Sequence, residues 1–177
     1  MDDFENLSVS KPFGPSIAEF SVKEKFVNDL NEYCKIVLNE EGRAEKLDVG
    51  KELAGQVKQE FEVDQNFFNL KINNYLTDMI KNYLWKSVEK QNESFKDFKN
   101  KIKVVYKNKW IVRQFENEYN PLHFHSGSVS GVCYILLPKN FGEKSQNQKK
   151  NNPNGCIALS HGSAQKARFV PARSGCP

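Results

Sequence analysis

The sequence lacks the features that would place it at a membrane or outside the cell. No run of about 18 apolar residues is present, so the sequence predicts no membrane-spanning helix. The first residues, Met1 to Asn6, are acidic and contain no apolar core, so they do not read as a signal peptide. We therefore expect a cytoplasmic protein that does not bind membranes.

Motifs of several enzyme classes are also missing. The chain has no Walker-type phosphate loop, no GxSxG, no HExxH and no Rossmann glycine pattern. Its 4 cysteines include no CxxC pair, which argues against a zinc ribbon or a thioredoxin-type redox site. A Cys–His nucleophile using Cys133 or Cys156 stays open, although nothing in the sequence places either thiol beside a base.

Charge of one sign does not dominate. The chain has 26 Lys and Arg against 22 Asp and Glu, for a net charge of +4. Such a balance indicates solubility rather than a nucleic-acid footprint. The Lys- and Asn-rich stretch 139–154 is interpreted as a solvated loop, so nucleic acid is the weakest of the candidate partners.

The residue pattern of the first part of the chain, residues 1–100, predicts an extended N-terminal segment followed by helices. An apolar stripe over 22–38 indicates an amphipathic helix, and Ser21 and Glu24 fit a capping box at its start. A second stripe over 68–88 predicts another helix, with Asp64 as its cap. The stretch 43–63 has no clean period and is predicted to be a loop with short elements.

The pattern changes near residue 101, where β-branched and aromatic residues become frequent. Helices followed by consecutive strands indicate an α+β fold with an antiparallel barrel or jelly roll over 101–177. The 177 residues favour one compact unit built from both parts. The strands are expected at 102–106, 110–115, 129–137 and 155–160.

Two of the 3 histidines stand at His123 and His125, separated only by Phe124. On a strand, residues i and i+2 point to the same face. Two imidazoles on one face are suitable neighbouring ligands for a divalent metal that accepts nitrogen. An exposed surface pair, or one half-buried histidine with an ordinary partner, is the alternative.

The segment from Trp110 to Pro138 resembles a known family. The sequence NPLHFHSGSVSGVCY within it is similar to the metal-binding core of the 2-oxoglutarate/Fe(II)-dependent oxygenases, in the prolyl-hydroxylase-like branch and its phage-encoded HxH variants. The segments 11–15 (KPFGP) and 53–57 (LAGQV) also resemble that branch. The resemblance covers most of residues 11–160, and the histidine segment is its most specific part.

The resemblance implies a fold, a chemistry and cofactors. The fold is a double-stranded β-helix of the jelly-roll or cupin type, with the N-terminal helices packed on it. His123 matches the first iron ligand, His125 stands where the wider family has Asp or Glu, and Tyr134 matches a tyrosine that can reach 2-oxoglutarate. The implied cofactors are Fe(II) and 2-oxoglutarate, and the implied reaction is a hydroxylation with succinate and carbon dioxide as co-products. The substrate and the oligomeric state stay open.

The sequence departs from the family after the histidine pair. Only 52 residues follow His125, and none forms the expected distal segment with a ligand histidine and a basic residue. His161 is the single candidate for a third ligand, and a loop or strand-end histidine is its other interpretation. The tail also changes in composition, which leads to the hypothesis of a truncated or frame-shifted chain that lacks the last barrel strands, and whether such a chain is active stays open. The alternative function is a non-enzymatic jelly-roll binding or structural protein of phage origin.

Overall fold

The computed structural model describes residues 6–12, 14–88, 93–142 and 154–160, and the backbone of 168–171. Contacts group the chain into two units, one formed by residues 28–131 and the other by 1–27 together with 132–177. The first of these contains most of the helices, the antiparallel pair of strands β3 and β4, and the histidine segment. The division at residue 100 stays an interpretation of the sequence.

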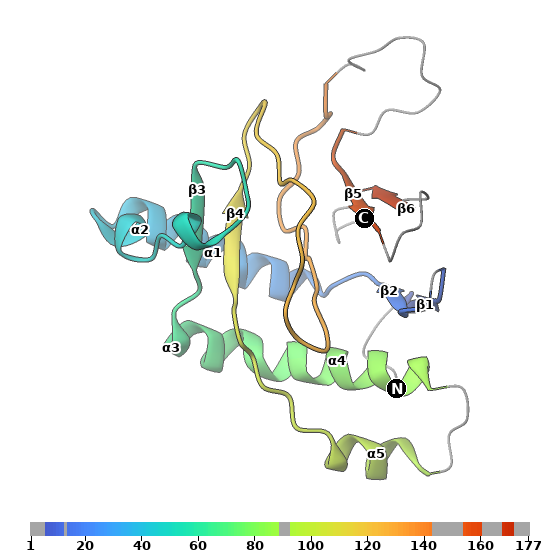
Figure 1. The fold of residues 1–177 in the computed structure, drawn as a ribbon. Coiled ribbons are helices and arrows are strands. Elements are labelled where there is room, and N and C mark those ends of the chain that lie inside the picture. Colours follow the sequence, from blue (N-terminus) through green and yellow to red (C-terminus); the bar gives the residue numbers. More distant parts are fainter. Residues whose placement is uncertain (1–5, 13, 89–92, 143–153, 161–167, 172–177) are drawn as a thin grey trace, which may run out of the picture. The chain divides into compact units, whose positions relative to one another are not determined.

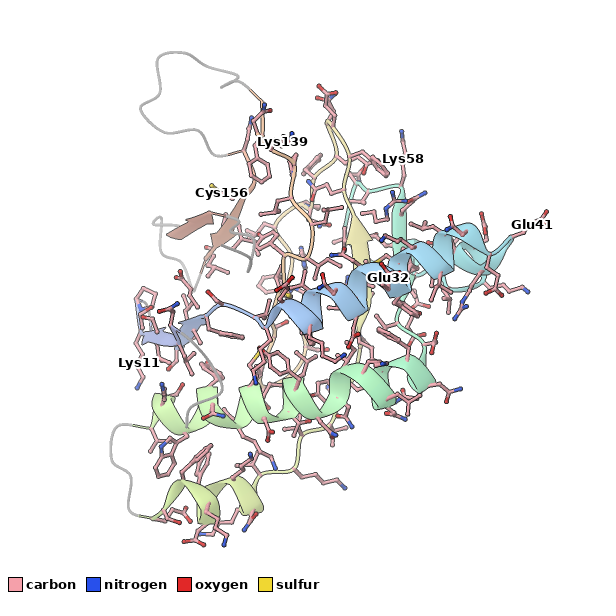
Figure 2. The ribbon with its side chains drawn as sticks, turned by 180° about the vertical axis from the view of Figure 1, so that it is seen from behind. Lys11, Glu32, Glu41, Lys58, Lys139 and Cys156 are labelled. Carbon is pink, nitrogen blue, oxygen red and sulfur yellow. The ribbon has the colours of Figure 1, made fainter. Side chains whose placement is uncertain are left out.

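Helix α1 (Glu24–Asn39) confirms the first predicted helix. Its buried side chains in the 28–131 unit, Leu30, Tyr33 and Val37, are spaced by three and four residues and therefore lie on one face. The helix begins at Glu24 itself, so the predicted capping box with Ser21 is wrong. The Phe26 amide of the first turn instead donates to the carbonyl of Lys23 at 2.9 Å. Figure 2 shows the side chain of Glu41 pointing outward just beyond this helix.

The stretch after α1 contains short elements, as predicted. They are α2 (Arg43–Lys46), the 3-10 turn η1 (Gly50–Glu52) and the strand β3 (Gln59–Glu62). Strand β3 pairs with β4 (Trp110–Arg113) in antiparallel register, with Phe61 opposite Ile111 (Figure 1). Both of these side chains are buried and form the core together with the inward face of α1.

The second predicted helix is confirmed, including its cap. It runs through α3 (Gln65–Phe67), a π-helical turn η2 (Phe68–Ile72) and α4 (Asn73–Ser87) without a break (Figure 1). The Asp64 carboxylate accepts the Phe67 amide at 2.8 Å, which satisfies one of the free donors of the first turn. A further helix, α5 (Phe95–Lys101), packs its Phe95 and Phe98 rings on Trp85 of α4.

The other unit contains two small antiparallel sheets. The first pairs β1 (Ser8–Ser10) with β2 (Ile17–Glu19) within the predicted extended N-terminal segment. The second pairs β5 (Cys156–Leu159) with β6 (Arg168–Pro171). Strand β5 confirms the strand expected at 155–160.

Two expected strands do not form. Residues 102–106 and 129–137 have no strand partner in the part of the chain that the structure describes. Residues 102–106 keep the alternating exposure of a strand, but a sheet also needs a neighbouring backbone to accept its hydrogen bonds. Because the described strands form only two-stranded sheets, the double-stranded β-helix stays a prediction.

Within the described residues, each helix is too short or too polar to reach from one side of a membrane to the other.

Candidate metal centre

A tight turn carries the chain from β4 to the histidine pair. Asn117 adopts a left-handed backbone with φ 64°, and the Glu118 carboxylate accepts the amides of Phe115 at 2.9 Å and Lys58 at 3.3 Å. The next residue, Tyr119, bridges to Gln56, whose amide donates to the Tyr119 carbonyl at 2.8 Å. The segment that leads into the histidines is therefore tied to the loop preceding β3.

The rings of His123 and His125 lie together. Their Nε2 atoms are 3.0 Å apart, and their ring centroids are 4.6 Å apart. The backbone is not a strand here, and the intervening Phe124 is fully exposed at 100%. The pattern correctly predicted that the two imidazoles meet, although it assigned the wrong local structure.

The donor set suits a divalent metal that prefers nitrogen. Two ligands at 90° with metal–nitrogen bonds of about 2.0–2.1 Å have their nitrogens about 3.0 Å apart, and the two Nε2 atoms show this separation. The Nδ1 of His123 lies 2.7 Å from the carbonyl of Pro121. A proton on Nδ1 would donate to that carbonyl and leave the Nε2 lone pair facing His125 Nε2, where it accepts a hydrogen bond from that atom or, once His125 Nε2 carries no proton, binds a metal.

The environment of His125 also favours a neutral ligand. The His125 ring is exposed overall, but its partial removal from water, followed by the nearby charge of His123, lowers the pKa of His125 below its usual value. The Trp110 indole lies nearly parallel to the His125 ring, with 6.4 Å between the ring centroids. A neutral imidazole keeps its lone pair, so His125 is ready to bind a metal at neutral pH.

The other two predicted site residues, His161 and Tyr134, lie in the part of the chain assigned to the other unit. His161 lies outside the described residues. Tyr134 belongs to the 132–177 part of the other unit, where burial and then the charge of Cys156 raise its pKa. Among the described residues, no three His, Cys, Asp or Glu side chains are arranged to hold one metal ion. The roles of His161 and Tyr134 therefore stay predictions.

Sequence reasoning missed a buried acid near this segment. Glu60 of β3 is only 2% exposed, and its Oε2 atom has no hydrogen-bond partner among the described residues. Burial raises its pKa, as do the charges of Asp48 and Glu118, whereas His123 lowers it. The one sequence signal for this site is the alternation of side chains along β3, which places Glu60 on the face of the strand opposite its neighbours. The local sequence does not show that both faces of the strand are buried.

Searches of protein-family models, curated proteins and solved structures gave no match for this chain.

Proposed function

We propose that this protein is a 2-oxoglutarate- and Fe(II)-dependent oxygenase that binds its iron through His123 and His125. The observation that carries the proposal is the 3.0 Å separation of the two Nε2 atoms, which fits neighbouring ligands of one metal. The resemblance of the 110–138 segment to this oxygenase family is the reason for proposing iron and 2-oxoglutarate. His161 is the proposed third ligand, and Tyr134 the proposed contact of the 2-oxoglutarate carboxylate.

The chain's own residues have simple roles in this proposal. Bound Fe(II) and 2-oxoglutarate would supply the oxidising power for hydroxylation of a substrate carbon. The carbonyl of Pro121 holds His123 in the tautomer that binds metal, and the Trp110 indole supports the ring of His125. With a second imidazole in place of a carboxylate, the site is one unit more positive than a His/carboxylate pair, which favours binding of the dianionic keto acid.

One observation favours the alternative of a non-enzymatic binding or structural protein. Both histidines and the neighbouring Leu122 are exposed, and Leu122 has 78% of its surface accessible. Oxygenation chemistry requires a pocket that excludes bulk water, and small-molecule sites are generally concave. A jelly-roll protein that uses this exposed surface to bind a partner would need no such pocket.

The test is anaerobic titration of the full chain with Fe(II) and 2-oxoglutarate, followed by exposure to air. We expect a visible charge-transfer band on formation of the ternary complex, and succinate after oxygen is admitted. His123→Ala and His125→Ala should each remove both signals. Phe124→Ala is the matched control, because it changes the fully exposed residue between the two ligands and should leave the band intact.

The outcomes separate the two functions. A band without succinate would show a chain that binds metal and 2-oxoglutarate but does not complete the reaction. Purified protein that takes up no iron, and whose histidine variants behave like the parent, would overturn the oxygenase proposal and favour the binding protein.

A further inference from the structure

The starting point is the buried carboxylate of Glu60. Its side chain projects from β3, and only 2% of the residue's surface is exposed to solvent. The Oε2 atom receives no hydrogen bond from the described residues. A carboxylate removed from water is strongly disfavoured unless a cation or hydrogen-bond donors replace the lost solvation. The buried Glu60 carboxylate therefore needs a cation or a hydrogen-bond donor beside it.

Side-chain oxygens of Glu60, Asp48 and Asn120 lie close to the Cα atoms of two glycines, Gly50 and Gly55. A methyl group placed on Gly50 would lie 3.6 Å from Glu60 Oε2 and 3.2 Å from Asp48 Oδ1. A methyl group on Gly55 would lie 2.7 Å from Glu60 Oε1 and would collide with Asn120 Oδ1. Asp48 Oδ1 lies beside Gly50 because it accepts the Gly50 amide at 3.0 Å, and the lack of side chains at the two glycines leaves room for the Asp48, Glu60 and Asn120 oxygens against this loop.

The carboxylates of Asp48 and Glu118 act on Glu60 as like charges, and His123 is the basic group that acts against them. Among the described residues, no Lys or Arg forms an ion pair with Glu60 or Asp48. The nearest basic residue along the chain, Lys58, is exposed and extends outward from the start of β3 (Figure 2). Glu118 is already occupied by two backbone amides.

We propose that Glu60, Asp48 and Asn120 form a binding site for a hard divalent cation of the Ca²⁺, Mg²⁺ or Mn²⁺ class. These ions take carboxylate and amide oxygens as ligands, and the three side chains carry these two kinds of oxygen. Asp48 and Asn120 are exposed, so an ion can reach the buried Glu60 oxygens from solvent and keep bound waters. The site differs in chemistry from the histidine pair, and the proposal does not depend on the oxygenase function.

The site would link three segments that are distant in sequence. Asp48 precedes η1, Glu60 lies in β3, and Asn120 stands three residues before His123. A bound cation would hold the 48–56 loop against the turn that carries the histidines. It would therefore stabilise the 28–131 unit and fix the approach to the histidine pair.

The experiment measures cation binding by the full chain after treatment with a chelator. Isothermal titration with Ca²⁺, Mg²⁺ and Mn²⁺ is combined with thermal melting in the presence and absence of each ion. We expect at least one of them to bind and to raise the melting temperature. Glu60→Gln and Asp48→Asn should each weaken binding by tenfold or more, because each removes one anionic ligand.

Matched variants make the result specific. Glu62→Gln removes the same charge from the exposed position two residues along β3, and should bind the cation like the parent. The double variant His123→Ala/His125→Ala should also retain binding. Gly55→Ala keeps every charge but pushes a methyl group into the Glu60 and Asn120 oxygens, so it should weaken binding as well. If Glu60→Gln fails to fold, Asp48→Asn and Gly55→Ala still test the site.

The opposite results would overturn the proposal. They are the absence of heat and of stabilisation with all three ions, or binding that persists unchanged in Glu60→Gln. Binding lost in the histidine variant but kept in Asp48→Asn would assign the ion to the histidine pair instead. In those cases a proton or a buried water, and not a cation, compensates Glu60.

Discussion

The indole of Trp110 and the imidazole of His125 lie face to face, with 19° between the ring planes and 6.4 Å between the centroids. Trp110 belongs to β4, and His125 follows after the turn at Asn117. This pairing places a fluorescent side chain beside the candidate metal ligand and gives a direct way to observe binding.

Metal binding at the histidine pair should quench the fluorescence of Trp110. The chain has 2 tryptophans, and the other, Trp85, is distant from the histidines in sequence and packs against Phe95 and Phe98 of α5. We expect Co²⁺ to quench the emission of the parent and of Trp85→Phe, but not of Trp110→Phe. Quenching that survives in Trp110→Phe would place the metal elsewhere.

Glu60→Gln should stabilise the metal-free protein, and increasingly so as the pH rises. Burial first, and then Asp48 and Glu118, raise the pKa of Glu60 in the folded state, so the folded protein binds more protons than the unfolded chain. Its ionisation then costs stability as the pH rises above the unfolded value of about 4.3. Melting of the parent and of Glu60→Gln in a chelator, from pH 4 upward at roughly half-unit steps, measures this gap. A gap that does not change with pH would contradict the expectation, and Glu62→Gln serves as the control.

Asp64 should contribute to stability both as a helix cap and as a charge. Burial alone would raise its pKa, but the Phe67 amide and the Arg43 guanidinium, 3.0 Å away, hold the pKa of this carboxyl below its usual value. Asp64→Ala should lower the free energy of unfolding by about 1 kcal/mol for the lost cap, and Asp64→Asn by less, because Asn also caps helices.

The pH dependence of the Asp64 contribution has a defined sign. A lowered folded-state pKa means that the contribution is present above the unfolded value of about 3.9 and is lost as the pH falls through the folded value. Urea unfolding at neutral and acidic pH should show the parent and Asp64→Asn converging at low pH. A constant difference between them would contradict the assigned pKa.

Tyr33→Phe should destabilise the protein by about 1–3 kcal/mol, although the ring itself is retained. The Tyr33 hydroxyl accepts the Asp64 amide at 2.9 Å and lies 3.4 Å from the Glu62 carbonyl, to which it donates. The ring is 3% exposed and stacks on Phe67, and burial raises the pKa of Tyr33 to about 12. Chemical denaturation measures the loss. A neutral result would mean that water replaces the hydroxyl.

Val37→Ala should cost about 2 kcal/mol, from the lost burial of two methyl groups and the small cavity that remains. Val37 has 0% exposure, whereas the preceding residue of α1, Ile36, is 53% exposed. Ile36→Ala is therefore the matched control and should change the free energy of unfolding by less than about 0.5 kcal/mol. Equal effects of the two changes would contradict the assigned inner face of α1.

The sequence by itself determined the local features of this protein. The three- and four-residue spacing of apolar side chains predicted α1 and the helix that ends with α4, and the Asp64 cap follows from a side-chain bond to an amide three residues away. The meeting of His123 and His125 was also predictable, because only one residue separates them. Each of these depends on neighbours within a few positions along the chain.

The tertiary structure decided the features that depend on distant partners. Strand β3 forms because β4 accepts its backbone hydrogen bonds from about 50 positions further along the chain, while residues 102–106, with better strand composition, find no such partner in the described residues. The burial of Glu60 follows from the same pairing, because the loop containing Gly50 and Gly55 and the turn carrying Asn120 cover its carboxylate. Backbone pairing and side-chain burial are properties of surfaces brought together by folding, so no local pattern contains them.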